Sequence, residues 1–340
     1  MPSFPVPATM QAAVVSETSG PFEIHDRPMP EVPPGHVLVR VGASGVNPLD
    51  TKIRAGVAAH AAHPLPAVLG MDMAGVVVQV GVGTTRFRVG DEVYGLVGGV
   101  GGLQGTLAEY VAVDADLLAH RPKSLSMRES AALPLVAITA WEGLVDRARA
   151  GAGHKVLVHG GAGGVGHVAI QIARALGADV YATAKPSQFD VVRSFGATPI
   201  DFTSATPADY VHEHTADEGF DVVYDTVGGA TLDASFVSVR RYTGHVVSAL
   251  GWGTHSLAPL SFRGASYSGV FTLMPMLSGK DRAHHGHILA QVAERVDAGQ
   301  LRPLLDTRRF TLGQAGDAHA RVTSGQAGGR VVVDIASLGR

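Results

Sequence analysis

The glycine-rich stretch at residues 159–166, HGGAGGVG, is the segment of this sequence whose spacing points most directly to chemistry. Its glycines at 161, 163 and 166 follow the pattern G-x-G-x-x-G, which binds the pyrophosphate of a dinucleotide when a strand precedes it and a helix follows. Glycine lets the backbone approach the phosphates, whose charge then meets the amides at the helix N-terminus. The chain holds 43 glycines in 340 residues, so the spacing alone is weak evidence. The segments on either side decide whether the stretch is a dinucleotide-binding loop.

Both flanking segments have the required character. Residues 155–160, KVLVHG, read as a buried strand, and residues 165–176 carry an apolar stripe with the period of a helix. The expected contacts with the dinucleotide are Ala162, Gly163, Gly164, Val165 and Gly166. A glycine-rich turn that binds nothing is the structural alternative.

The end of the next strand selects the dinucleotide. NAD sites place an acid there, about 20 residues beyond the glycines, to hold the ribose hydroxyls. This sequence has Thr183, Ala184 and Lys185 instead, while Asp179 lies at the wrong end of the strand and Asp190 in the next helix. A lysine can meet the 2′-phosphate of NADP(H), so we predict NADP(H) bound at these three residues. The alternative for Lys185 is a solvated lysine.

The rest of the chain divides around this site. The first 130 residues contain short apolar runs separated by Gly and Pro, which is typical of a small barrel or sandwich. From there to about residue 272, strand-like runs such as DVYATA and FDVVYDTVG alternate with helical ones, which indicates a parallel, doubly wound sheet. The final strand, GGRVVVDIA, is expected to return to the first domain. We therefore expect an α/β protein in which a discontinuous domain, 1–130 and 273–340, flanks a dinucleotide-binding domain, 131–272.

Composition excludes several classes of function. The net charge of −3 gives no basic footprint for nucleic acid, and the absence of cysteine removes thiolate catalysis and every cysteine-based zinc site. No apolar run reaches the roughly 18 residues of a membrane span, and the N-terminus does not resemble a signal peptide. We expect a cytoplasmic protein that acts on a small molecule.

Seven blocks, in order, carry a family resemblance over nearly the whole chain: GVNPLD, LGMDMAGVV, VGDEVYG, LPLVAITAW, GGAGGVGHVAIQIARALGA, FDVVYDTVGG and GGRVVVDI. The chain resembles the zinc-independent quinone oxidoreductase branch of the medium-chain dehydrogenase/reductase superfamily. The resemblance implies a Rossmann domain joined to a GroES-like β-barrel domain. It also implies a homodimer formed through the exposed edge of the Rossmann sheet near SYSGVFTLM.

The resemblance also raises the question of a metal. Zinc-dependent members of the superfamily place a cysteine ligand where Asn47 stands and a Gly-His-Glu where this chain has Gly70-Met71-Asp72. An amide and a thioether cannot replace a thiolate and an imidazole on zinc. We therefore expect no catalytic zinc, and a reaction that depends on positioning an electrophilic acceptor against the cofactor.

The catalytic candidates are Asn47, Asp50 and Lys52. The Asn47 amide can donate to a carbonyl oxygen or hold the nicotinamide end of the cofactor. Asp50 can orient neighbouring groups, or can simply cap the loop. Several quinone reductases of this branch have tyrosine where this chain has Lys52. A lysine there could stabilise an oxyanion or deliver a proton, as in related enoyl reductases, or could be a surface lysine.

Further cofactor contacts follow from the resemblance alone. They comprise a threonine near the nicotinamide ribose, backbone beside the cofactor, a segment flanking the nicotinamide and a basic residue from the last strand: Thr139, Leu250, Gly251, Phe271, Leu273 and Arg330. The expected reaction is hydride transfer from NADPH to a quinone or a similar conjugated carbonyl compound. Reduction of a C=C bond in an enoyl thioester or enal is the first alternative, and an NADPH-binding structural or regulatory protein without turnover is the second.

Overall fold

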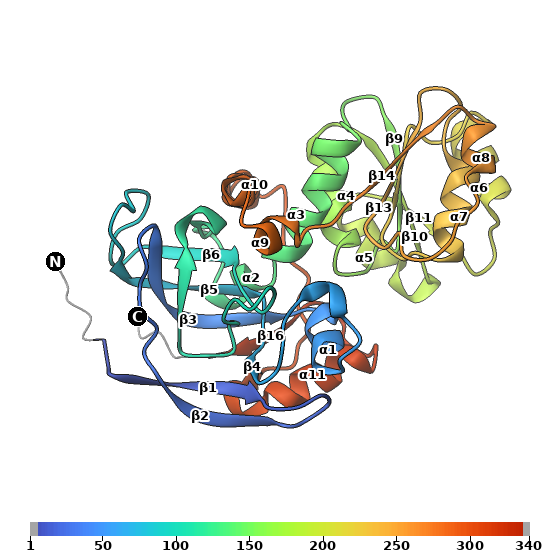
Figure 1. Ribbon diagram of the computed structural model, residues 1–340. Coiled ribbons are helices and arrows are strands. Elements are labelled where there is room, and N and C mark those ends of the chain that lie inside the picture. The colour runs from blue at the N-terminus through green and yellow to red at the C-terminus, as the bar shows by residue number, and fades with distance from the viewer. Residues whose placement is uncertain (1–5, 336–340) are drawn as a thin grey trace. The chain divides into compact units, whose positions relative to one another are not determined.

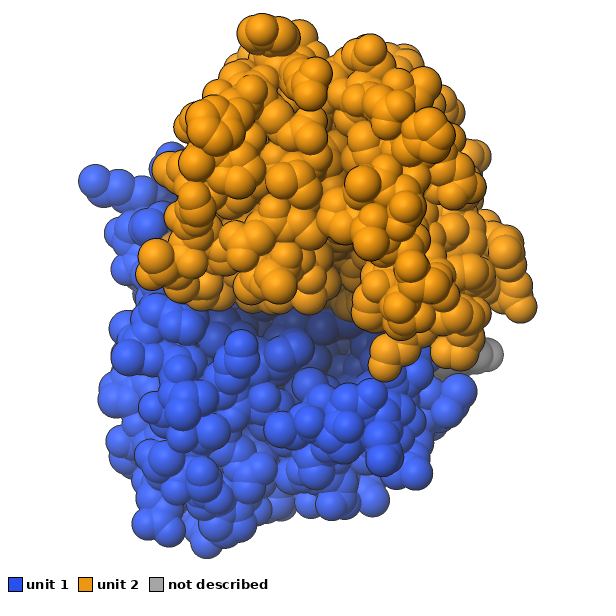
Figure 2. All heavy atoms as spheres, turned by 90° about the vertical axis from the view of Figure 1, so that its right-hand side faces the viewer, with its two compact units in different colours: residues 1–135, 273–298, 303–340 blue, residues 136–272, 299–302 orange. Residues whose placement is uncertain are grey.

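The computed structural model describes residues 6–335 and divides the chain into two compact units (Figures 1 and 2). Unit 1 comprises the chain up to residue 135, residues 273–298 and the chain from residue 303 onward, and unit 2 comprises residues 136–272 and 299–302. The segment 299–302 is bound to α4 (Gly166–Ala175) of unit 2 through Gln171, which contacts Arg302. Its Nε2 donates to the carbonyl of Arg302 at 3.0 Å, and its Oε1 accepts from the Arg302 amide at 3.0 Å.

Unit 2 is a six-stranded parallel sheet with the strand order β11-β10-β9-β12-β13-β14. This is the doubly wound order of a dinucleotide-binding fold, so the predicted Rossmann architecture is confirmed. Its elements alternate along the chain: β9 (Lys155–His159), α4 (Gly166–Ala175), β10 (Asp179–Ala184), α5 (Phe189–Ser194), β11 (Thr198–Asp201), α6 (Pro207–Thr215), β12 (Val222–Asp225), α7 (Ala230–Ser238), β13 (His245–Ser248), α8 (Ala258–Ser261) and β14 (Ser266–Gly269). The segment from α3 (Pro134–Trp141) into a π-helical turn at Glu142–Arg147 leads into this unit.

The helix after the glycine loop is amphipathic, as the sequence predicts. Val168, Ala169 and Ile172 of its apolar stripe are fully buried. A separate core, built from Phe220, Val223, Phe236 and other apolar side chains, packs between the sheet and α6, α7 and α8. Because parallel strands covered by helices are buried on both faces, β9 and β12 are almost continuously apolar.

Unit 1 contains one antiparallel sheet, a second sheet that is antiparallel except for the parallel pair of β15 and β16, and the remaining helices, the architecture expected of a GroES-like β domain. Three strands form one sheet in the order β2-β1-β4, and the other runs β15-β16-β3-β5-β6-β8 with β7 also on β3. The elements are β1 (Thr9–Val15), β2 (Phe22–Pro28), β3 (His36–Val46), α1 (Pro48–Arg54), β4 (Ala67–Val68), β5 (Asp72–Val80), β6 (Glu92–Leu96), β7 (Tyr110–Asp114), β8 (Leu118–His120), α2 (Met127–Ala131), α9 (Met274–Ser278), α10 (Arg282–Asp297), β15 (Phe310–Thr311), α11 (Ala315–Thr323) and β16 (Val331–Asp334).

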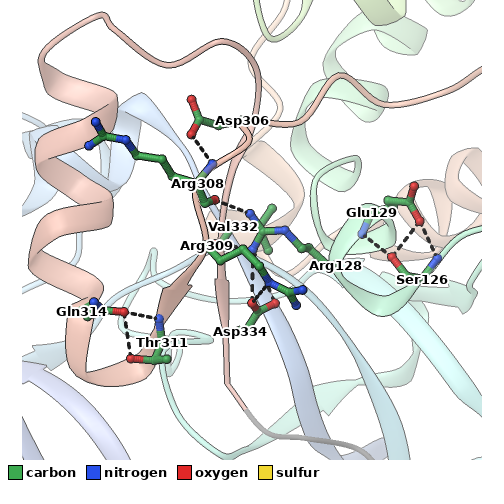
Figure 3. A network of polar contacts seen from close by, with 10 residues as sticks. All are labelled: Ser126, Arg128, Glu129, Asp306, Arg308, Arg309, Thr311, Gln314, Val332 and Asp334. Atoms are coloured by element: carbon green, nitrogen blue, oxygen red, sulfur yellow. Dashed lines mark hydrogen bonds and ion pairs between the residues drawn. The ribbon is translucent and has the colours of Figure 1, made fainter.

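The C-terminal strand joins the first part of the chain, as predicted. β16 pairs antiparallel with β3, with Val331 opposite Val46. Side chains reinforce the junction (Figure 3): Arg128 of α2 donates to the Val332 carbonyl at 2.9 Å and forms an ion pair with Asp334 at 3.4 Å. Asp334 also accepts from Arg309 at 3.0 Å. These contacts hold β16, and therefore Arg330 just before it, in a fixed place within unit 1.

Membrane insertion by a helix has no support in the described part of the chain, where no helix is both long and apolar enough to cross a bilayer.

Candidate functional sites in the two units

The glycine loop lies at the carboxyl end of β9 and is attached to the neighbouring strand β10. The amide of Gly160 donates to Oγ1 of Thr183 at 3.1 Å, and the amide of Gly161 donates to the Thr183 carbonyl at 2.9 Å. Thr183 is buried, so its hydroxyl positions the loop rather than facing solvent. Ala184 is also buried beneath the loop.

Steric crowding explains why two positions of the loop are glycine. A Cβ at Gly161 would lie 2.6 Å from Cβ of Ala182, and a Cβ at Gly166 would lie 2.1 Å from the carbonyl oxygen of Gly160. These two positions therefore admit no side chain without movement of the backbone. Gly163 and Gly164 are exposed instead, so their backbone is open to a ligand. The loop leads into a ten-residue helix whose N-terminus favours an anion. The residues present thus suit the pyrophosphate of a dinucleotide.

The end of β10 carries a cation and no acid. Lys185 follows the strand directly and is exposed, and it forms no ion pair with any residue that the structure describes. Asp179 starts the same strand at the opposite edge of the sheet, and Asp190 lies in α5, where it pairs with Arg193 at 3.1 Å. A cation therefore stands at the strand end where NAD sites carry an acid, and its contact with a cofactor stays a prediction.

The carboxyl ends of β12 and β13 are joined by Asp225, a residue that the sequence reasoning missed. Its buried carboxylate accepts from the amides of Val227 and Gly228, at 3.0 and 2.9 Å, and from the Ser248 hydroxyl at 2.7 Å. Ser248 Oγ in turn accepts from the amide of Leu250 at 3.1 Å. The network fixes the backbone into Leu250, one of the predicted cofactor contacts. The signal was available in the sequence, because Asp225 ends a strand at the ligand-binding edge.

His159, the last residue of β9 and directly before the glycines, is buried beside the loop. Its Nδ1 lies 3.2 Å from Oγ1 of Thr183, and its carbonyl accepts from the hydroxyl of Thr226 at 2.6 Å. Burial lowers the pKa of His159 to about 4, with a smaller opposing effect from Asp225. The imidazole is therefore neutral at pH 7 and adds no charge next to the phosphate-binding loop.

The other residues predicted to contact the cofactor lie in different units. Thr139 is buried in unit 2 with its Oγ1 2.8 Å from Oγ1 of Thr272, and its carbonyl accepts from the Tyr224 hydroxyl at 2.7 Å. Phe271 and Gly251 also lie in unit 2, whereas Leu273 is buried in unit 1, where it precedes α9. The roles assigned to all of these residues stay predictions.

In unit 1, Asn47, Asp50 and Arg330 meet in one buried network with Asp72, which the sequence reasoning did not assign to the site. Asn47 donates from Nδ2 to Oδ2 of Asp72 at 3.0 Å and accepts at Oδ1 from Arg330 at 2.7 Å. Arg330 also donates to Asp72 at 3.2 Å and to the carbonyl of Ala132 at 3.0 Å. Asp72 completes its contacts by accepting from the amide of Leu135 at 2.9 Å.

Asp50 belongs to the same network through the start of α1. The helix begins after Asn47 with Pro48 in its first turn. The backbone N–H of Asn47 donates to Oδ2 of Asp50 at 2.7 Å. Burial raises the pKa of Asp50 to about 7, although the Asn47 amide and Arg330 act in the opposite direction. Burial likewise raises the pKa of Asp72 to about 6, with Arg330 opposing. Near neutral pH the network therefore holds one guanidinium, one carboxylate and one carboxyl group that is close to its titration point.

This geometry changes what Asn47 and Arg330 can be expected to do. Both side chains are buried, and both ends of the Asn47 amide bond to other members of the network. In this arrangement the two residues hold the start of α1 against β5 and β16. Their direct contact with a cofactor or a substrate stays a prediction.

Lys52, by contrast, is exposed on α1 and lies outside the network. The helix buries Asp50 and Ile53 and leaves Lys52 toward solvent. The segment after the helix lines an open cavity of about 360 Å³ with Gly56, Ala58 and His63 among its walls. The volume lies within the range of small-molecule sites, but Lys52 is not one of the lining residues.

The residues that stand where the family resemblance expects zinc ligands do not suit that metal. Met71 is fully buried beside Asp72, and the amide of Asn47 is bonded at both ends. Within residues 6–335, no group of three or more His, Asp or Glu side chains is arranged to hold a metal ion. The residues present therefore do not fit a zinc centre of the kind found in the zinc-dependent dehydrogenases.

Two family models match the chain. Residues 33–123 match the alcohol dehydrogenase GroES-like domain, and residues 195–333 match the zinc-binding dehydrogenase domain. The "NADPH-dependent alkenal/one oxidoreductase, chloroplastic" of Arabidopsis thaliana is 34% identical over 340 residues, which cover 96% of this chain and 80% of the relative. The chain belongs to the medium-chain dehydrogenase/reductase superfamily.

Solved structures agree with this assignment. An alcohol dehydrogenase superfamily protein from Novosphingobium aromaticivorans is 56% identical, with a TM-score of 0.95 over 96% of this chain and 100% of that one. The quinone oxidoreductase from Coxiella burnetii is 26% identical, with a TM-score of 0.79 over 96% and 100% of the two chains. Together these findings confirm the predicted resemblance to the zinc-independent quinone oxidoreductase branch.

Proposed function

We propose that this dehydrogenase/reductase is an NADPH-dependent oxidoreductase that reduces a quinone or a similar conjugated carbonyl compound without a catalytic zinc. The observation that carries the proposal is the pairing of a glycine loop, anchored on Thr183, with an exposed Lys185 at the end of the next strand. A cation in the place of the usual acid favours a 2′-phosphate over free ribose hydroxyls. The names of the Arabidopsis and Coxiella relatives support the same class of reaction.

The residues of unit 2 would bind and orient the cofactor. Bound NADPH supplies the hydride. The exposed backbone at Gly163 and Gly164 would hold the pyrophosphate, and the N-terminus of α4 would stabilise its charge. The Asp225–Ser248 network holds the backbone at Leu250, where the nicotinamide end is expected.

Unit 1 would supply the polar groups for the acceptor. Reduction of a carbonyl-conjugated acceptor builds negative charge on an oxygen, and a preorganised cation or donor at that oxygen contributes roughly 100- to 1,000-fold in rate. Lys52 is the exposed cation next to the network, and Asn47, Asp72 and Arg330 hold the start of its helix. We assign Lys52 this role, with Asn47 and Asp50 as positioning residues.

Reduction of a C=C bond is the second candidate function. The Arabidopsis relative is named for alkenals and alkenones, and an exposed lysine can deliver the proton that such a reduction also requires. A protein that binds NADPH without turnover is the remaining alternative, since membership of a family does not by itself imply activity.

The test is NADPH oxidation by the purified protein with a small benzoquinone and, separately, with 2-hexenal, each for wild type and Lys52→Ala. The proposal predicts turnover with the quinone, with a preference for NADPH over NADH. Faster turnover of 2-hexenal that is lost in Lys52→Ala would favour the alkene reductase. Tight NADPH binding with neither acceptor reduced would favour the non-enzymatic alternative.

Two further parts of the proposal concern assembly and location. β14 is the last strand of the unit 2 sheet and pairs with β13 on one side, so its outer edge offers a second copy of the chain a strand to pair with. We propose a homodimer through this edge and a cytoplasmic location; the absence of cysteine fits a reducing compartment. Sedimentation of the purified protein tests the first, and microscopy of a tagged protein tests the second.

A further inference from the structure

Unit 2 carries an exposed tryptophan, Trp252, at the carboxyl edge of its sheet. Trp252 lies in the loop that follows β13, and 55% of its surface is exposed. The exposed indole offers a large, flat apolar face on which another aromatic ring can stack. The other tryptophan of the chain, Trp141, is buried.

The loop holds Trp252 in place through its backbone. Nε2 of His255 lies 3.4 Å from the carbonyl of Trp252, and Nδ1 lies 2.8 Å from the carboxylate of Asp233 on α7. The hydrogen bond to Asp233 raises the pKa of His255. Gly253 has φ of 108°, a conformation that side chains rarely adopt. The exposed indole therefore belongs to an anchored loop.

A second aromatic ring forms a corner with it. The ring of Phe271 lies 6.2 Å from that of Trp252, with the two planes at 84°. Phe271 follows β14 as Trp252 follows β13, and the two strands are parallel neighbours with Ser248 opposite Gly269. Both rings therefore lie at the carboxyl edge of the sheet, the edge that also carries the glycine loop and Lys185.

The order of strands places this corner at one end of the expected cofactor. Lys185 follows β10, the glycine loop follows β9, and Leu250 follows β13, so a dinucleotide that runs from Lys185 across the loop ends beside β13. Trp252 is two residues beyond Leu250. A molecule that accepts a hydride at the nicotinamide end would therefore lie next to the aromatic corner.

We infer that Trp252 and Phe271 select acceptors with a flat, conjugated ring, such as a naphthoquinone, over short aliphatic enals. A third ring can stack on the indole while its edge meets the face of Phe271, and both arrangements are favourable for aromatic groups. A short aliphatic chain offers neither contact. The inference rests on the proposed function and adds to it the class of acceptor and the residue that determines specificity.

The kinetic test compares Trp252→Ala with wild type on 1,4-naphthoquinone and on 2-hexenal. We expect kcat/KM for the naphthoquinone to fall about tenfold, while that for 2-hexenal changes by less than about twofold. Trp252→Phe should retain most of the naphthoquinone activity, because a smaller ring still stacks. Tyr242→Ala is the matched control, since Tyr242 is 85% exposed but precedes β13 and so lies at the opposite edge of the same sheet.

A binding test makes the inference independent of turnover. In the Trp141→Phe background, Trp252 is the only fluorophore of its kind, since the chain has two tryptophans. With NADP⁺ present, no hydride is available, and 1,4-naphthoquinone should quench the remaining fluorescence saturably. Equal losses of kcat/KM for both acceptors, no loss in Trp252→Ala, or quenching that only matches free tryptophan would each overturn the inference. Absence of turnover in wild type together with saturable quenching would contradict the proposed function alone.

Discussion

Arg330 and Asp72 form an ion pair at 3.2 Å in which the side chains are 5% and 0% exposed. The two residues are 258 positions apart in sequence, and the pair joins the strand β5 to the segment just before β16. Asn47, which accepts from Arg330 at 2.7 Å, and Asp72 are two of the positions that the family resemblance aligns with zinc ligands. A buried guanidinium and carboxylate thus hold the segment around Asn47 in this chain.

Removing the cation from this pair should destabilise the folded protein. Arg330→Met leaves Asp72 buried without its charge partner, and such losses lower the free energy of unfolding by about 3–5 kcal/mol. Urea unfolding measures the change. Arg309→Ala is the control, because its ion pair with Asp334 is largely exposed and should contribute less than about 1 kcal/mol. If the two variants lose the same small amount, the buried pair does not stabilise unit 1.

The raised pKa of Asp50 predicts a specific dependence of stability on pH. Its folded-state pKa of about 7 exceeds the ordinary value of 3.8, so between these values the folded protein binds more protons than the unfolded chain. Stability from this group is therefore present below about pH 4 and declines as the pH rises to about 7. Asp50→Asn should remove that decline and raise the free energy of unfolding above pH 7 by up to about 4 kcal/mol.

Urea unfolding of wild type and Asp50→Asn across this pH range checks the prediction. Only the difference between the two proteins matters, since other groups titrate in both. A difference that stays constant from pH 4 to pH 8 would show that Asp50 keeps its ordinary pKa.

Lys185→Ala should weaken the binding of NADPH by about 10- to 100-fold, because it removes a charge-assisted contact with the 2′-phosphate. The affinity for NADH, which lacks that phosphate, should not change. Fluorescence titration of both nucleotides measures the effect, with Lys280→Ala as an exposed control in unit 1. Equal weakening of both nucleotides, or of neither, would remove Lys185 from the cofactor site.

Gly166→Ala tests the packing of the glycine loop. Its new Cβ would lie 2.1 Å from the carbonyl oxygen of Gly160, so the loop and α4 must move apart. We expect the dissociation constant for NADPH to rise by at least about tenfold, as loss of loop geometry removes several backbone contacts. Gly151→Ala, where no heavy atom lies within 4 Å of the new Cβ, should bind NADPH as wild type does.

The sequence predicted the parts of this protein that depend on local pattern. Alternation of apolar strands and helices indicated the unit 2 sheet, and the glycine loop was recognised because β9 and α4 flank it. β14, with the sequence SYSG, carries no apolar alternation, so its pattern does not predict a strand and only the family resemblance indicated a sheet edge near it. Its neighbour β13 provides the pairing that makes it one.

The polar networks could not be predicted in the same way. Arg330 bonds to Asn47 across 283 residues, and Asp225 to Ser248 across 23, and no local period links either pair. Asn47 was expected to face a ligand, yet its amide is bonded within unit 1. Residue type indicated that it was polar and important, but only the fold shows which groups satisfy it.

Whether the reaction needs zinc can be measured directly. Protein is dialysed against a chelator, its metal content is determined before and after, and its oxidation of NADPH with 1,4-naphthoquinone is followed. We expect turnover to persist in metal-free protein, and Lys52→Ala to lower kcat without lowering thermal stability, because Lys52 is exposed. Turnover that disappears on dialysis and returns with added zinc would contradict this expectation.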